Sequence, residues 1–182
     1  MKNLHYKYLI AWSLILGLIV LIIKNGFYIN LFDNSMPAGI YKRINEKPKK
    51  GSFAITCLSQ EIAWYGLERG YLRRGLCSTG IQPVLKRVMA IEGDTLSFNT
   101  GLIFINGKLV DGYRIWELDS SKRPLKVFYA NGHYIVKKNE YWLMSNHKPN
   151  SWDSRYWGAV PVEGLVKPVL VFNGESDYER RE

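Results

Sequence analysis

The chain has 182 residues, 47% hydrophobic and 14% aromatic, and a formal net charge of +9. This composition excludes an intrinsically disordered protein and is sufficient for one domain with a packed core. The basic residues are scattered and no nucleic-acid-binding motif accompanies them, so we expect a basic surface near a membrane and no nucleic-acid partner.

The first predicted element is a transmembrane helix, which an almost unbroken apolar run over residues 8–23 indicates. The run is slightly short for a full span, and flanking lysines together with the apolar stretch 26–32 can supply the missing length. A run without a polar face argues against a buried helix of the folded domain. No small-x-small cleavage site follows it, so an uncleaved anchor is favoured over a signal peptide.

The charge asymmetry around this run is weak, and the simplest topology places a short tail inside and a large domain outside. We therefore expect a cytoplasmic tail over residues 1–7, an anchor over 8–25 and an extracytoplasmic β-rich domain over 26–182. Within this domain, a small insertion or satellite is expected around residues 107–140.

Beyond residue 32, short β-like runs alternate with turn residues. The pair Asn106-Gly107 is the strongest hairpin signal in the chain. One short helix is predicted over residues 59–69. The fold class is therefore mostly β with one N-terminal transmembrane helix. Strands are predicted over residues 51–58, 84–91, 95–98, 102–105, 108–110, 134–137, 141–145 and 164–172.

Several familiar sites are missing from the sequence. It contains neither a G-x-S-x-G elbow nor an H-E-x-x-H motif, and His133 and His147 lie in no recognisable triad context. No cysteine–histidine cluster has zinc spacing, so no metal or cofactor is expected. Cys57 and Cys77 would form a disulfide outside the cytoplasm and would stay reduced inside it.

Ser35 is the first candidate for chemistry, because it lies just past the apolar run and precedes Met-Pro-Ala-Gly. The proline and glycine favour a turn at the membrane surface. A serine in a turn usually has no further role, so this segment gains meaning only from the others.

Lys86 is the second candidate. Strand alternation places it on one face with Val88 and Ala90, and places Arg87 and Met89 on the other. A lysine among apolar neighbours loses its proton more easily, and a neutral lysine can act as general base on a serine hydroxyl. The alternative is a lysine on an edge strand that points into water.

The third candidate segment runs over residues 150–158 and contains Ser151, Asp153 and Arg155. The acidic, hydroxyl and basic side chains are close enough in sequence to form a hydrogen-bonded ionic turn. The alternative is an ordinary surface loop.

Five segments, taken in this order after one anchor, resemble the type I signal peptidase family. The resemblance covers most of residues 9–172. Within the family, the Ser-Met-Pro-Ala-Gly-Ile-Tyr form and the Gly-Leu-Cys segment before the lysine are most similar to the TraF-type peptidases of conjugative plasmids. The five segments are Ser-Met-Pro at 35–37, Gly-Ser-Phe-Ala at 51–54, Lys-Arg-Val-Met-Ala-Ile-Glu-Gly-Asp at 86–94, Ile-Asn-Gly-Lys at 105–108 and Ser-Trp-Asp-Ser-Arg-Tyr-Trp-Gly at 151–158.

This resemblance implies that Ser35 is the nucleophile and Lys86 the general base. It makes Asp153 the third functional position, with Arg155 as its partner, and implies that Ser151 orients the lysine.

The oxyanion site departs from the family pattern. Asp33 stands where signal peptidases often carry a serine that helps to hold the oxyanion, and a carboxylate there would oppose that charge. The backbone N–H of Ser35 remains a candidate donor, and Asn34 is a further supporting residue.

The resemblance implies a single-pass inner-membrane Ser–Lys endopeptidase with its catalytic domain in the periplasm, where Cys57 and Cys77 would be paired. Its expected partners are the lipid bilayer, through the helix, and a membrane-inserted precursor, in particular a conjugative pilin precursor cut next to small residues. Release by water and cyclisation by an amine both stay open. The alternatives are a general leader peptidase and a non-catalytic membrane-anchored binding module of a secretion or pilus apparatus.

Overall fold

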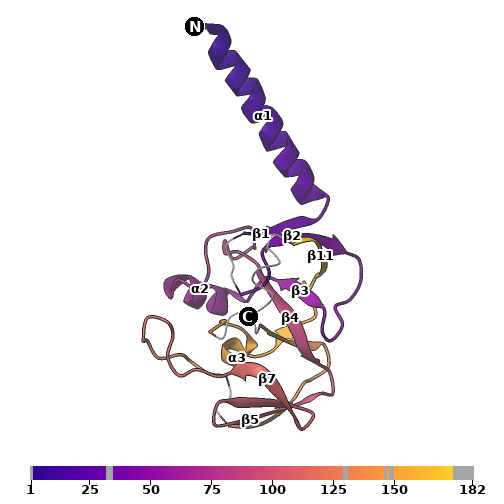
Figure 1. Cartoon of the computed structure of the whole chain (residues 1–182), viewed down its shortest axis with the longest axis vertical. Helices are drawn as coiled ribbons and strands as arrows, with labels where there is room; N and C mark the ends of the chain where they lie inside the picture. Colours follow the sequence, from indigo (N-terminus) through magenta and orange to yellow (C-terminus); the bar gives the residue numbers. More distant parts are fainter. Residues whose placement is uncertain (1, 32–34, 129–130, 146, 148–149, 174–182) are drawn as a thin grey trace.

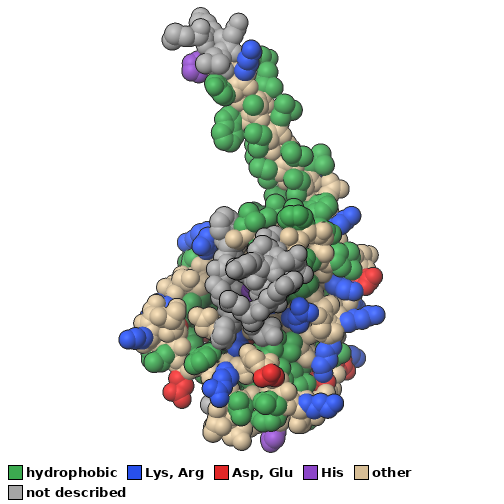
Figure 2. Space-filling model, in the orientation of Figure 1, with side chains coloured by type: hydrophobic (Ala, Val, Ile, Leu, Met, Phe, Trp, Pro, Cys, Tyr) green, Lys and Arg blue, Asp and Glu red, His purple; other side chains and the backbone are tan. Residues whose placement is uncertain are grey.

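The computed structural model describes residues 2–31, 35–128, 131–145, 147 and 150–173. A long N-terminal helix, α1 (Lys2–Lys24), projects from a domain built mostly of β-strands (Figure 1). Residues His5–Lys24 have a mean hydropathy of 2.2 and are not buried by the rest of the chain, so α1 is long and apolar enough to cross a membrane. Figure 2 shows its largely hydrophobic surface above a domain that carries charges of both signs.

The predicted extension of the membrane span into residues 26–32 was wrong for the residues that the structure describes there. Gly26 has a positive φ of 77°, which stops the helix, and its backbone N–H bonds to the carbonyl of Ile23. The aromatic and β-branched residues that follow form strand β1 (Phe27–Asn30), which pairs with β2 (Gly39–Ile44).

The described residues of the domain form three sheets, and every strand pair among them is antiparallel. The sheet next to α1 has the strand order β1-β2-β11, the central sheet β10-β9-β4-β3, and the sheet farthest from α1 β7-β6-β5-β8 (Figure 1). The mostly β class is therefore confirmed. The remaining bounds are β3 (Phe53–Thr56), β4 (Val84–Ile91), β5 (Thr95–Asn99), β6 (Leu102–Ile105), β7 (Lys108–Arg114), β8 (Gly132–Ile135), β9 (Glu140–Met144), β10 (Val160–Pro161), β11 (Lys167–Asn173), α2 (Gln60–Glu68) and α3 (Ser154–Trp157).

The hairpin predicted at Asn106-Gly107 connects β6 to β7. Both residues have positive φ, 52° and 75°, as a two-residue type I′ turn requires. The predicted helix over 59–69 corresponds to α2. Strands β1, β2 and β10 and the short helix α3 were not predicted.

Strand β4 lies in the middle of the central sheet, between β9 and β3. Its side chains alternate as expected: Lys86, Val88 and Ala90 are buried, whereas Arg87 and Met89 are half-buried. The edge-strand alternative for Lys86 is therefore wrong.

Two apolar clusters support the central sheet. Ala54, Val88 and Leu143 belong to a cluster that also includes residues of α2 and α3. Ala90 and Trp142 belong to a second cluster, shared with strands β5 and β6. The sheet farthest from α1 thus packs on the central sheet through a common core.

A disulfide joins Cys57, just after β3, to Cys77, on the segment that leads into β4. Their Cα atoms are 5.7 Å apart. The bridge closes a loop that contains α2, so it fixes this helix beside the central sheet.

Candidate active site

Ser35 and Lys86 are in direct contact. The side-chain nitrogen Nζ of Lys86 donates a hydrogen bond to Oγ of Ser35. Lys86 is only 3% exposed, and Ala54 is its neighbour across the β4–β3 pair, so its side chain is almost completely buried. The pair brings together residues 51 positions apart, one from the segment after β1 and one from the central strand.

The turn that follows Ser35 is held by the sheet next to α1. Asn30, which is 2% exposed, donates through Nδ2 to the carbonyls of Met36 and Pro37 at 3.1 Å each. The hydroxyl of Tyr41 donates to the Pro37 carbonyl at 2.7 Å. Met36 is buried with Tyr41 and Leu85, so the Met-Pro pair anchors the serine against β4.

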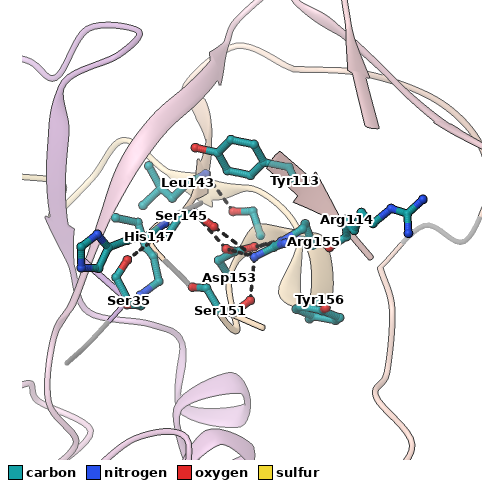
Figure 3. Close-up of polar contacts among 12 residues, drawn as sticks. Ser35, Tyr113, Arg114, Leu143, Ser145, His147, Ser151, Asp153, Arg155 and Tyr156 are labelled. Atoms are coloured by element: carbon teal, nitrogen blue, oxygen red, sulfur yellow. Dashed lines mark hydrogen bonds and ion pairs between the residues drawn. The ribbon is translucent and has the colours of Figure 1, made fainter. Parts of the chain in front are cut away.

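Asp153 and Arg155 form a completely buried ion pair, in which both side chains are 0% exposed. Arg155 Nε and Nη2 each lie 2.7 Å from a different carboxylate oxygen of Asp153 (Figure 3). The guanidinium also donates to the carbonyls of Ser151 at 2.8 Å and Arg114 at 2.6 Å. The predicted ionic turn is therefore present, and the surface-loop alternative is wrong.

Two consequences follow from the geometry of this pair. Asp153 also accepts the backbone N–H of Arg155 at 3.2 Å and caps α3. Burial disfavours the charged form of Arg155, but the charge and hydrogen bonds of Asp153 outweigh it and raise the pKa of Arg155 above its ordinary value. The pair is thus a completely buried support held by several hydrogen bonds.

Ser145 connects this support to Ser35, and sequence reasoning missed it. Its backbone N–H donates to Asp153 at 3.0 Å, and its hydroxyl donates to the carbonyl of Ser35 (Figure 3). The hydroxyl also accepts the backbone N–H of His147 at 3.1 Å. The available sequence signal was its position, because a polar residue directly follows the apolar strand β9. In the structure this residue is only 1% exposed.

Ser151 lies where the resemblance implies, at the wall of a cavity that also contains Ser35 and Lys86. Its hydroxyl is buried and makes no hydrogen bond to any of the residues that the structure describes, so its orienting role stays a prediction. Asp33 and Asn34 lie outside the described residues, so the supporting role of Asn34 stays a prediction.

The cavity beside Ser35 and Lys86 has a volume of about 320 Å³. Its walls come from the end of α2, from the segment between β7 and β8, and from the segment that precedes α3. Apolar and polar groups share its surface. It is lined by Ser35, Gly70, Tyr71, Leu72, Val84, Lys86, Asp119, Ser120, Leu125, Asn150, Ser151, Trp152 and Tyr156.

Asp119 joins two walls of this cavity, and sequence reasoning gave it no role. Its carboxylate accepts the hydroxyl of Tyr71 at 2.6 Å and Nε of Arg123 at 2.8 Å, and it lies 3.6 Å from Arg69 Nη1. Arg123 also donates to the carbonyl of Arg69 at 2.7 Å. The segment between β7 and β8 is therefore tied to the end of α2.

The contact between Asp119 and Tyr71 changes the pKa of both side chains. Burial opposes its ionisation, but the hydrogen bonds from Tyr71, Arg123 and the backbone of Ser121 together hold the pKa of Asp119 well below its usual range. Burial and the same carboxylate raise the pKa of Tyr71 to about 12. No group of three or more metal-ligating side chains occurs among the described residues.

Comparisons with known proteins agree on one family. The model of "Signal peptidase, peptidase S26" matches residues 8–172. A plasmid transfer protein TraF from Escherichia coli is 31% identical, over 76% of this chain and 80% of that one. A conjugal transfer protein TraF from Agrobacterium tumefaciens is also 31% identical, over 83% and 86%. A crystal structure of a signal peptidase I from Enterococcus faecalis aligns with a TM-score of 0.39 and 21% identity, over 69% of this chain and 98% of that one.

Proposed function

Because the chain belongs to the signal peptidase family, peptidase S26, we propose that it is a membrane-anchored serine endopeptidase with Ser35 as nucleophile and Lys86 as general base. The observation that carries this proposal is the hydrogen bond from Lys86 Nζ to Ser35 Oγ, made on a buried face of the central sheet. A lysine is seldom buried unless it has a specific partner, and here that partner is a serine hydroxyl.

The proposed reaction has two steps. Neutral Lys86 takes the proton of the Ser35 hydroxyl while Oγ attacks the scissile carbonyl, and the backbone N–H of Ser35 helps to hold the oxyanion. The C–N bond breaks, the leaving amine takes the proton from Lys86, and the substrate acyl group stays on Ser35. Water or an amine then attacks this ester, which gives a free carboxyl end or a new peptide bond and restores the hydroxyl.

In this proposal Asp153 is a positioning residue. It holds the backbone of Ser145, whose hydroxyl in turn holds the carbonyl of Ser35. Proximity of this kind matters, because small displacements of a nucleophile cost large factors in rate. Arg155 neutralises the buried carboxylate, and Ser151 supplies a hydroxyl at the wall of the cavity beside Lys86.

The proposed substrate is a membrane-inserted precursor of a conjugative transfer system, in particular a pilin precursor. Support comes from the relatives named as plasmid and conjugal transfer proteins, which match most of this chain. The single apolar helix suits an inner-membrane enzyme with a periplasmic catalytic domain, which would meet precursors at the membrane surface. Cyclisation of the product by aminolysis of the acyl-enzyme is the finer part of the proposal.

The test is processing of a pilin precursor by the full-length protein in membranes. Ser35→Ala and Lys86→Ala should each lower processing by at least about a thousandfold. Ser78→Ala and Lys108→Ala change an exposed serine and an exposed lysine that do not line the cavity, and should leave the rate unchanged.

Each competing function predicts a different result. If both site variants still process the precursor, the Ser35–Lys86 dyad is wrong. If the wild type processes no precursor at all, a non-catalytic binding module becomes the better description. If the wild type cuts a generic secretory precursor and leaves the pilin precursor intact, it is a general leader peptidase. Mass spectrometry of the product separates hydrolysis from cyclisation, because ring closure removes one water.

A further inference from the structure

A second cavity adjoins the one at Ser35 and Lys86. It has a volume of about 400 Å³ and lies between α2 and the segment 126–128. Trp152 and Tyr156 line both cavities, so the two hollows meet at these rings. Trp152 stacks on Tyr65, in the second cavity, with ring centroids 6.0 Å apart, and lies 5.2 Å from the ring of Tyr71, in the first.

The same three parts of the chain form the walls of both cavities. One wall is α2 with the residues that follow it, another is the segment 119–128, and the third is the segment 150–157. The hydrogen bonds of Asp119 and Arg123 hold the first two walls together, and Phe128 N–H donates to the Arg155 carbonyl at 3.2 Å. The two cavities therefore share walls that these hydrogen bonds hold in place.

The second cavity differs from the first in chemistry. Ile62, Tyr65 and Phe128 give it an apolar and aromatic lining, and Phe128 is 43% exposed although it is a large hydrophobic side chain. Glu61 and Lys126 bring one charge of each sign, so the lining has no net charge. Such a surface suits a large apolar side chain better than a charged or small one.

We propose that this second cavity is a substrate subsite that receives a large apolar or aromatic side chain of the polypeptide whose scissile bond lies at Ser35. The inference rests on the proposed peptidase function, because the walls that this cavity shares with the one at Ser35 and Lys86 identify the occupant. The first cavity then holds the substrate residues next to the scissile bond. The second binds a residue farther along the substrate.

Ser59 offers a way to block the second cavity without touching the first. It is exposed, lines the second cavity, and precedes α2 without making a side-chain cap hydrogen bond, so Ser59→Trp removes no packing. Gln60→Trp is the matched control, because Gln60 is the exposed neighbour and does not line either cavity. A second pair is Tyr65→Ala against Trp64→Ala, on the same helix but with only Tyr65 in the cavity.

The probe is a series of synthetic peptides with an Ala-x-Ala cut site and one Phe placed in turn at each other position on either side. In the wild type, one Phe position should raise kcat/KM by roughly tenfold over Ala. This preference should disappear in Ser59→Trp and Tyr65→Ala and should persist in Gln60→Trp and Trp64→Ala.

Titration calorimetry with the Ser35→Ala protein measures the same preference as binding, without any cleavage. If peptides bind with a Phe preference that Ser59→Trp removes, but the wild type cuts none of them, the subsite stands and the peptidase function fails. Suppose that the wild type cuts the peptides, but that no Phe preference in kcat/KM is lost in Ser59→Trp and Tyr65→Ala. The peptidase function then stands and the subsite is overturned. Binding without a Phe preference overturns it as well.

Discussion

The hydroxyl of Ser145 donates a hydrogen bond to the carbonyl of Ser35, and this contact links the proposed nucleophile to the end of strand β9. Through its own backbone N–H, Ser145 is also held by the carboxylate of Asp153 at 3.0 Å. The position of Ser35 therefore depends on the buried ion pair of Asp153 and Arg155, which lies in a distant part of the sequence.

Removal of the Ser145 hydroxyl should reduce catalysis more than stability. Ser145→Ala loses two hydrogen bonds, one to the Ser35 carbonyl and one from the His147 backbone N–H, which lowers the free energy of unfolding by roughly 1–3 kcal/mol. Because the Ser35 backbone is then less well positioned, kcat should fall by roughly tenfold to a hundredfold with little change in KM. Steady-state kinetics measure this split, and Ser145→Thr, which keeps a hydroxyl, should recover part of kcat. Equal kinetics in Ser145→Ala and wild type would contradict the positioning role.

Substitution of Asp153 should mainly destabilise the fold. Asp153→Asn leaves the buried guanidinium of Arg155 without its counter-charge, at a cost of roughly 3–5 kcal/mol in the free energy of unfolding. Denaturant unfolding measures this loss, and Asp111→Asn, at an exposed position, serves as the control. Should Asp153→Asn unfold at the same denaturant concentration as wild type and yet be inactive, Asp153 would act directly in the reaction.

The contribution of Asp119 to stability should depend on acidic pH. Its pKa is depressed in the folded protein, so its stabilisation is complete above the unfolded value of about 3.9 and is lost as the pH falls through the lower folded value. The difference in Tm between wild type and Asp119→Asn should be constant above about pH 5 and should shrink below about pH 4. Thermal scans across this range test it, and a difference that stays constant down to the acid end contradicts it.

Tyr71 should show the opposite behaviour at alkaline pH. Its pKa is raised to about 12, so it contributes stability below the unfolded value of about 10, and that contribution is lost as the pH rises from 10 towards 12. Ultraviolet titration should find one fewer high-pH tyrosine in Tyr71→Phe. In Asp119→Asn the same tyrosine should titrate at lower pH, since the carboxylate that holds its proton is gone.

Reduction of the disulfide should lower stability without removing the site. The bridge closes a loop with a sequence separation of 20 residues, for which chain entropy predicts roughly 3 kcal/mol. Denaturant unfolding with and without dithiothreitol measures the effect, and the Cys57→Ser/Cys77→Ser double variant should not respond to the reductant. Two free thiols in protein isolated from the periplasm would contradict the pairing.

Local patterns carried the predictions that succeeded. Alternation along 84–91 was sufficient to place Lys86 on the buried face of β4, and Asn106-Gly107 specified its hairpin through the positive φ of both residues. In each case the signal lies within a few neighbouring residues.

The features that were missed depend on contacts between distant segments. The apolar residues 27–30 read equally well as membrane helix or as strand, and only Gly26 and the partner strand β2 decide between them. Asp119 is an ordinary loop aspartate until Tyr71, 48 residues away, bonds to it. Ser145 likewise acquires its role from Ser35, at a separation of 110 residues.

The connection between α1 and the first sheet is very short. The helix ends at Lys24, and the carbonyl of Gly26 already accepts the backbone N–H of Arg43 at 2.8 Å, so almost no free chain separates helix from sheet. With α1 in the bilayer, this short connection would keep the first sheet, and with it the turn that follows Ser35, close to the membrane surface. We expect such a peptidase to cut peptide bonds that lie near that surface.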